Sequence, residues 1–190
     1  KNIIIYLNYI MASSNSSSRK KSRVGIYIKS VLQRKVVLSF DLLGGNLKKN
    51  LLVSLQNNLE GKCSTEGYIK KKSIQVIAYS AGVIEGSHVN FVVSFECLIC
   101  KPCEGMLIKC LVKNKTKAGI RAIIDSEESP LTIFIAREHH TKNETYNKAK
   151  ENDMISAKVI GIRYQLNDDF VSILGELEKI VGMKKLNIKK

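Results

Sequence analysis

Five apolar, strand-like runs, each bounded by turn-forming or polar residues, constrain this chain more than any other feature of its sequence. Each run is rich in Ile and Val and is bounded by Gly, Asp, Asn or Pro, which is typical of strands joined by turns. A longer polar excursion separates the third run from the fourth, and this order predicts a five-stranded OB-type barrel. The runs cover residues 106–114, 120–124, 131–136, 154–164 and 170–176.

The first half of the chain has a different pattern, which predicts an α+β fold. Residues 24–32 and 35–40 are expected to be extended, and Gly44 and Gly45 then break the chain. Leucines recur at four-residue spacing over 47–60, so we expect an amphipathic helix with Asn46 as its N-cap and Gly61 at its end. Further strands are expected over 73–79 and 89–99. The helix would cover one face of the resulting sheet.

These patterns divide the 190 residues into four parts. Residues 1–23 are expected to be a flexible basic tail, because a run of Ser, Asn, Lys and Arg cannot bury enough apolar surface to order itself. Within it, we expect residues 1–10 to be translated upstream sequence and Met11 the functional start, the alternative being an ordered accessory strand. Residues 24–101 form the predicted tip domain, 102–178 the barrel and 179–190 a second basic tail, since Pro102 ends the preceding strand.

The charge of the chain favours an anionic partner. The formal net charge is +14, of which residues 1–101 carry +10 and residues 102–190 carry +4. Such an excess predicts contact with nucleic acid or with acidic proteins, but it does not specify a fold. Five cysteines, an odd number, fit a reducing compartment better than a disulfide framework.

Both halves together resemble a known family. The residues that carry the resemblance are Glu60-Gly61-Lys62-Cys63 with Gly67-Tyr68-Ile69, Lys101-Pro102 with Gly105, Gly119, Phe134-Ile135, Ile160-Gly161 and Ile173-Leu174-Gly175. In this order, over roughly residues 24–177, they are similar to the larger stalk subunit of multisubunit DNA-directed RNA polymerases. That protein is the seventh subunit of RNA polymerase II, and archaeal polymerases have a counterpart of it.

The resemblance implies a non-catalytic protein with no cofactor. In that family the amino-terminal tip docks on the polymerase core and pairs with a smaller stalk subunit, while the barrel contacts nascent RNA and no membrane is involved. The implied location is the nucleus for a cellular protein, or a cytoplasmic virus factory or virion for a viral one. The docking residues that we expect in the tip are Gly44, Gly45, Leu55, Gly61, Cys63, Gly67 and Tyr68.

Cations at strand ends of the barrel are the candidate RNA-binding residues, because such cations can follow a phosphate backbone. We expect Phe134 to lie in the barrel core, and Ile120 stands where such barrels often have an aromatic residue, which removes one platform for base stacking. The alternative is that the cations are ordinary solvated positions. The candidates are Lys113, Lys115, Lys117, Arg121, Arg137, His139 and Arg163.

Two other kinds of site are weaker hypotheses. Cys97, Cys100, Cys103 and Cys110 suggest zinc, but in a continuous strand Cys97 and Cys100 point to opposite faces, so no metal is expected. The pair His139-His140 suggests acid–base chemistry, but no nucleophile or carboxylate dyad accompanies it.

Three functions therefore remain open. The first is a polymerase stalk subunit, the second is a free-standing protein that binds single-stranded RNA through an OB fold, and the third is a virion or nucleoprotein component. The second would not need the first-half domain, which favours the stalk subunit. A bias toward Lys, Asn and Ile indicates an A/T-rich genome, as in a large DNA virus or some protists.

Overall fold

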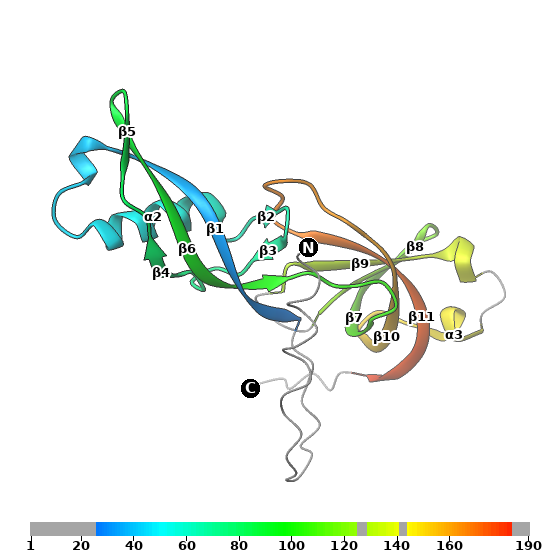
Figure 1. The fold of residues 1–190 in the computed structure, drawn as a ribbon. Helices are drawn as coiled ribbons and strands as arrows, with labels where there is room; N and C mark the ends of the chain where they lie inside the picture. The colour runs from blue at the N-terminus through cyan, green and yellow to red at the C-terminus, as the bar shows by residue number, and fades with distance from the viewer. Residues whose placement is uncertain (1–25, 125–128, 141–143, 184–190) are drawn as a thin grey trace, which may run out of the picture.

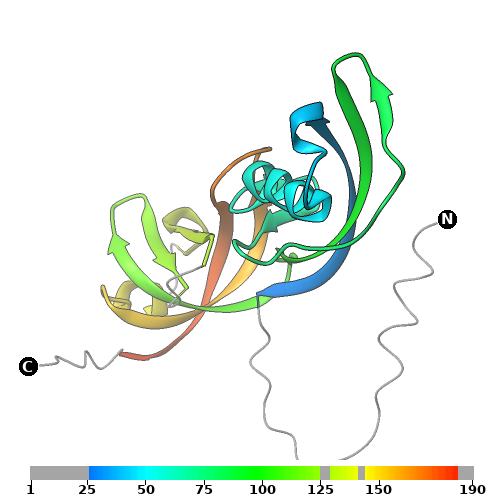
Figure 2. The ribbon, with the colours of Figure 1, turned by 90° about the vertical axis from the view of Figure 1, so that its left-hand side faces the viewer.

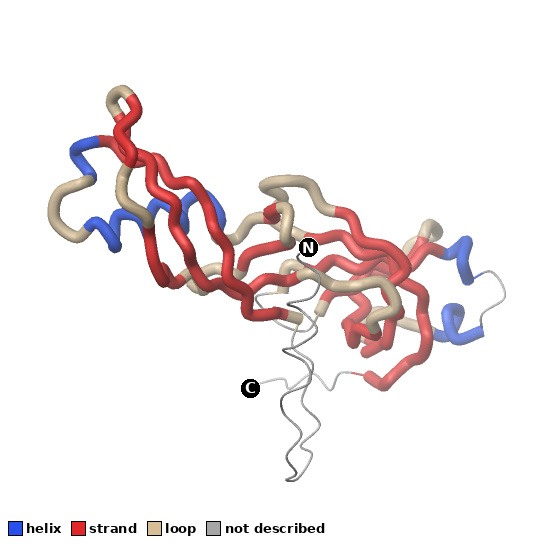
Figure 3. The backbone as a smooth tube through the Cα atoms, in the orientation of Figure 1, coloured by secondary structure: helices blue, strands red, loops and turns tan. Residues whose placement is uncertain are grey.

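The computed structural model describes residues 26–124, 129–140 and 144–183 and shows an elongated molecule with a β-sheet structure at each end (Figures 1 and 3). The predicted tail over 1–23, and residues 184–190 of the tail predicted over 179–190, lie outside the described residues. The first structure, which we call the tip sheet, contains β1 to β6 and is covered by α2. The second is a barrel of β7 to β11.

Two long antiparallel strands form the backbone of the tip sheet. β1 (Tyr27–Ser39) pairs with β6 (His88–Cys100) along its whole length. The two extended segments expected near the start are therefore one strand, because β6 offers a continuous partner. The other side of β6 pairs in turn with β5 (Val83–Glu85), β4 (Gln75–Tyr79) and β3 (Gly67–Ile69), and β3 pairs with β2 (Cys63–Ser64).

The helix α2 (Leu47–Leu59) lies on one side of the curved β1 and β6 ribbon, as Figure 2 shows. Its N-cap is confirmed, since the Asn46 side chain accepts a hydrogen bond from Lys49 N at 3.1 Å. Leu51 and Leu55 are buried against the core of the tip sheet. Gly61 follows the helix with φ of +74°, a left-handed conformation that favours glycine. A short 3-10 turn, η1 (Phe40–Leu42), precedes the helix.

The predicted five-stranded barrel is confirmed. β7 (Leu107–Lys115), β8 (Gly119–Ile123), β9 (Leu131–Ala136), β10 (Asp153–Arg163) and β11 (Val171–Met183) close in the order β10-β11-β9-β8-β7. β11 and β9 are parallel and the other pairs are antiparallel. η2 (Arg137–His140) and α3 (Glu144–Lys148) occupy the excursion between β9 and β10.

β11 is longer than the sequence indicated. Lys179 lies opposite Ser156, and Met183 lies opposite Asp153 of β10. Residues 179–183 are therefore part of the barrel rather than of a basic tail. This stretch reads Lys-Ile-Val-Gly-Met, and its partner in β10 supplies the backbone hydrogen bonds that extend the strand.

Tip sheet and barrel share a packed junction. Cys63, Tyr68 and Cys100 come from the first half of the chain but are buried in the same apolar cluster as the barrel core. The backbone of Cys63 also donates to Asp168 O at 2.8 Å and accepts from Asn167 N at 2.9 Å. The loop between β10 and β11 is thus fastened to β2.

Candidate nucleic-acid interface on the barrel

Four strands of the barrel present their outward side chains on one continuous face. In one row across β8, β9, β11 and β10, Arg121 lies opposite Phe134, Phe134 opposite Leu174, and Leu174 opposite Gly161. In the next row the directly opposed residues are Ile123, Thr132, Ser172 and Arg163. We call these eight positions the outer barrel face. It combines two guanidinium groups, two hydroxyls and one aromatic ring.

Phe134 lies on this face, so the expectation that it fills the barrel core is wrong. Its neighbours Ile133 and Ile135 point inward and are almost completely buried, and the alternation of a strand then turns Phe134 outward, where it is 40% exposed. A Cβ at Gly119 would lie 2.8 Å from Phe134 Cζ. The absence of a side chain there lets the ring lie against β8. The alternation Ile133-Phe134-Ile135 is the signal in the sequence that could have revealed this position.

Ile120 has no role at the surface. It is fully buried in the barrel core opposite Ile135. An aromatic residue at this position would point into the barrel rather than offer a platform to a base. An exposed aromatic ring lies instead at Phe134, on the neighbouring strand.

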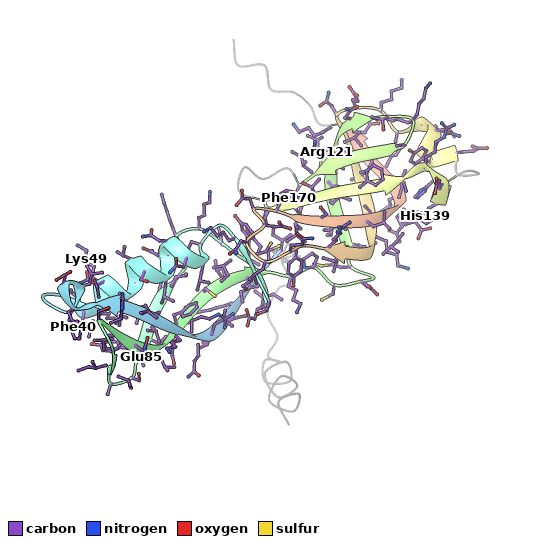
Figure 4. All side chains as sticks on the ribbon, turned by 90° about the horizontal axis from the view of Figure 1, so that it is seen from above. Phe40, Lys49, Glu85, Arg121, His139 and Phe170 are labelled. Atoms are coloured by element: carbon purple, nitrogen blue, oxygen red, sulfur yellow. The ribbon has the colours of Figure 1, made fainter. Side chains whose placement is uncertain are left out.

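Six of the seven predicted cations are exposed, and they lie in three places. Arg121 and Arg163 lie on the outer barrel face, and Lys113 is the exposed extra residue of a β-bulge beside it, between Val112 and Asn114. Lys117 is exposed in the turn between β7 and β8. Arg137 and His139 are exposed in η2, and Figure 4 shows His139 at the end of the barrel remote from the tip, away from Arg121 and Phe170.

The ammonium group of Lys115 is hydrogen-bonded within the protein. Its Nζ donates to the carbonyl oxygens of Tyr146, Asn147 and Ala149 at 2.8 to 3.0 Å. The same ammonium group lies 5.3 Å from the centroid of the Tyr146 ring. A cation near the carbonyl groups at the end of α3 is stabilising, because these groups carry partial negative charge. Lys115 thus holds α3 on the barrel.

His140, rather than His139, is the buried member of the histidine pair. Its Nδ1 is 2.9 Å from Ala136 O, and its Nε2 accepts from Leu177 N at 2.8 Å, which assigns the ring proton to Nδ1. The ring stacks on Tyr146 with centroids 5.2 Å apart. Burial raises the pKa of the Tyr146 phenol, while Arg137 lowers it. Both ring nitrogens of His140 are occupied by backbone groups, which assigns this histidine a structural role.

The cysteines lie in different cores. Cys97 is buried in the tip sheet, whereas Cys100 belongs to the cluster at the junction and Cys110 to the barrel. Burial raises the pKa of Cys97 to about 11, and of Cys100 and Cys110 to about 12. Among residues 26–124, 129–140 and 144–183, no three His, Cys, Asp or Glu side chains are grouped as ligands of a metal ion.

The predicted docking residues of the tip lie in two places. Leu55, Gly61, Cys63, Gly67 and Tyr68 are buried and cannot contact a partner directly. Gly44 and Gly45 are exposed between η1 and α2, at the end of the tip sheet remote from the barrel. Apolar side chains that the sequence analysis did not select are exposed at this distal end: Phe40, Leu42, Val83 and Ile84.

The fold and its outer face define the class of protein. It consists of an α+β sheet that is fastened to a five-stranded OB-type barrel, with cations and an aromatic ring on the barrel surface. No helix in the described part of the chain has both the length and the apolar character needed to cross a membrane.

Comparison with known proteins shows which proteins of this class the chain is similar to. The chain is 26% identical over 168 residues to a protein of Acanthamoeba polyphaga mimivirus that is named provisionally as a DNA-directed RNA polymerase subunit, covering 80% of this chain and 82% of the relative. It is 23% identical over 171 residues to DNA-directed RNA polymerase II subunit 7 of Arabidopsis thaliana, covering 77% and 95%. Subunit RPB7 of Glycine max matches with the same identity and coverage. No family model matches.

These similarities confirm the resemblance to the seventh subunit of RNA polymerase II, and they indicate a component of an RNA polymerase. The matched length extends over both the tip sheet and the barrel, since neither part alone has 168 residues.

Proposed function

We propose that this chain is the larger, non-catalytic stalk subunit of a multisubunit DNA-directed RNA polymerase. The tip docks on the polymerase core and meets a smaller stalk subunit, and the barrel contacts nascent RNA during transcription. The relatives support the assignment to a polymerase. The protein acts in the nucleus if the chain is cellular, and in a cytoplasmic virus factory or the virion if it is viral.

The outer barrel face carries the proposal of RNA contact. Strands two and three of an OB barrel are the usual surface for oligonucleotides, and these strands are β8 and β9, which supply Arg121 and Phe134. The ring of Phe134 can stack on a base without regard to its identity. Arg121 and Arg163 can neutralise phosphates on either side of it. This combination favours weak binding that does not depend on sequence.

A salt titration tests the RNA contact on the full-length chain with a labelled single-stranded RNA. Each neutralised phosphate contributes about −0.7 to the slope of log affinity against log salt, so replacing both Arg121 and Arg163 with Ala should flatten the slope by about 1.4. Phe134→Ala should weaken binding by about 1–3 kcal/mol for RNAs of unrelated sequence. Lys148→Ala, which removes an exposed cation of α3, is the matched control. An unchanged slope in the double variant would place the RNA elsewhere.

The distal end of the tip carries the proposal of docking. Phe40 and Leu42 are each 46% exposed and lie beside Gly44 and Gly45. Apolar side chains grouped at one end of an elongated molecule are typical of a protein interface. The buried docking candidates, such as Leu55 and Tyr68, would then act by shaping the tip.

Co-purification with the polymerase tests the docking. The double variant Phe40→Asp with Leu42→Asp should fold but no longer co-purify with the core subunits, because it places charge in an apolar contact. Leu107→Asp, at an exposed position on the barrel, should still co-purify. If wild-type protein bound RNA but never associated with a polymerase, the free-standing RNA-binding function would replace the stalk assignment.

A further inference from the structure

A groove runs between the free edge of β1 and the helix α2. It consists of two hollows of about 310 Å³ and 240 Å³. Asn58 lines both, so the two hollows are neighbours. The larger one is bounded by Val37 and Leu42 near the distal end, and the smaller one by Lys62 and Leu166 at the junction with the barrel. The two hollows therefore lie in line from the distal end of the tip toward the junction, beside Arg34, Val37 and Leu38 of β1.

The side of α2 that faces this groove is uncharged. Its lining residues are spaced by three and four along the helix, as expected for a single face. An exposed helix face normally carries charged residues, but here it carries one apolar side chain, one hydroxyl and three amides, of which Asn50 Nδ2 donates to Leu42 O at 2.7 Å. Amide groups can donate to and accept from the backbone of an extended polypeptide. The face consists of Asn50, Val53, Ser54, Asn57 and Asn58.

β1 provides the other wall and has one unpaired edge. It is the terminal strand of the tip sheet, and within the described residues β6 is the strand that pairs with it. An edge of 13 residues is long, and its backbone N–H and C=O groups are a template for one more strand. Val37, at this edge, is 52% exposed.

The charged residues around the groove indicate the charge of the strand that it would bind. Residues 26–100 contain nine Lys or Arg and five Asp or Glu. Glu66, Glu85 and Glu96 are paired with Arg34, Lys35 and Lys29 of β1, and Glu60 accepts hydrogen bonds from backbone N–H groups. Lys62 Nζ donates to Asn57 O at 3.5 Å, and no acid of the described residues lies within ion-pair distance of it. β1 itself carries no acid, and each of its three cations is paired with one of these glutamates.

We propose that this groove binds an extended acidic segment of another protein, which adds to the tip sheet as a strand beside β1. Strand addition would supply affinity through the backbone. Alternate side chains of the segment enter the hollows beside Val53, and an acidic side chain meets Lys62. This surface is separate from the distal end that we assign to polymerase docking.

A synthetic peptide of six Glu-Val repeats, labelled with fluorescein, tests the proposal on the full-length chain. Its binding should be measurable by anisotropy at low salt, and the corresponding Lys-Val peptide should not bind. Lys62→Glu should weaken binding about fivefold, and Val53→Trp, which fills the groove, roughly tenfold or more. The matched controls are Lys109→Glu on the barrel and Val92→Trp on the uncovered face of the tip sheet, and both should bind like wild type.

Hydrogen exchange of the complex locates the peptide. The amides of β1 should become protected on binding, while those of β5 should not change. Absence of binding by the Glu-Val peptide, or protection outside β1 and α2, would overturn the proposal. Displacement of the peptide by a 12-nucleotide oligouridylate, in a manner that depends on Lys62, would assign the groove to nucleic acid instead.

Discussion

At the scale of single residues, Lys115 shows how hydrogen bonds within the protein change the role of a cation. Its ammonium group is surrounded by three carbonyl oxygens and the face of Tyr146. Lys113 and Lys117, two positions to either side, remain exposed. The three lysines are alike in sequence, but only two of them are available to a phosphate.

Replacing Lys115 should therefore affect stability rather than RNA binding. We expect Lys115→Met to lower the free energy of unfolding by about 1–3 kcal/mol, because hydrogen bonds to a charged group are lost and carbonyl groups of α3 are left without a donor. Urea denaturation measures this loss. Lys117→Met should leave the stability unchanged, and an equal effect of the two substitutions would contradict the structural role of Lys115.

The cysteines provide a residue-scale prediction that depends on pH. Burial raises the pKa of the Cys63 thiol from 9.0 to about 11, with smaller contributions from Asp168 and Asp169. Cys97, Cys100 and Cys110 are shifted in the same direction, whereas Cys103 is exposed. The unfolded chain releases these protons at lower pH than the folded one, so this contribution to stability is complete below pH 9 and is lost as the pH rises toward 11.

Titration with a thiol reagent tests directly which of the cysteine thiols are buried. In folded protein at about pH 8, below the usual thiol pKa, a disulfide reagent should modify one thiol per chain quickly, at Cys103, because the other four are buried as thiols. After denaturation all five should react. Fast modification of two or more thiols in the folded protein would show that one of the cores is open to solvent.

At the scale of elements, the end of α2 is connected to the turn before β4 through one carboxylate. Glu60 accepts hydrogen bonds from the backbone N–H groups of Lys72, Ser73 and Ile74 at 2.8 to 3.1 Å. Lys72 has a positive φ of 57°. This turn would otherwise leave several donors without a partner, so the helix and the turn are fixed together.

Glu60→Ala should consequently destabilise the tip. The expected loss is about 1–3 kcal/mol, since a charged acceptor of three donors is removed. Glu85→Ala, which removes an exposed carboxylate from the β5 hairpin, serves as the control. Thermal denaturation followed by circular dichroism measures both. Similar melting temperatures for the two variants would mean that water can accept the three N–H hydrogen bonds in place of Glu60 with no loss of stability.

At the scale of the whole molecule, the junction makes the tip sheet and the barrel one mechanical unit. Tyr68 is buried between the two, opposite both Cys63 and Cys100. Tyr164 Oη donates to Thr65 O at 3.4 Å, which adds a second connection beside the backbone bonds of Cys63. RNA on the barrel and a partner on the tip would therefore be held at a fixed separation.

Tyr68→Ala tests whether the two parts unfold together. Removing a buried aromatic side chain lowers the free energy of unfolding by about 3–5 kcal/mol. If the two parts share one core, this loss should speed the hydrogen exchange of amides in both of them. Hydrogen exchange should show faster opening of β4 in the tip and of β9 in the barrel. If the protection of β9 did not change, the junction would be a contact between independent domains.

The sequence by itself determined the two ends of the helix α2 and the order of the barrel strands. Asn46 and Gly61 delimit the helix through interactions within a few residues, and the five Ile- and Val-rich runs predict the barrel strands. Cys97 and Cys100 were assigned to opposite faces by strand alternation alone, and they lie in different cores. These features depend on neighbours in the chain, which a sequence displays directly.

Only the tertiary structure decided which side chains are available for function. Lys115 is not available to a ligand because its ammonium group donates to Ala149, 34 residues away in the sequence. The backbone of Cys63 is held by a hydrogen bond to Asp168, from the other half of the chain. Arg121, Phe134 and Arg163 form one face because closure of the barrel aligns their strands. The groove beside β1 likewise exists because the sheet ends there. Such relations arise from packing between distant segments, and no local pattern in the sequence encodes them.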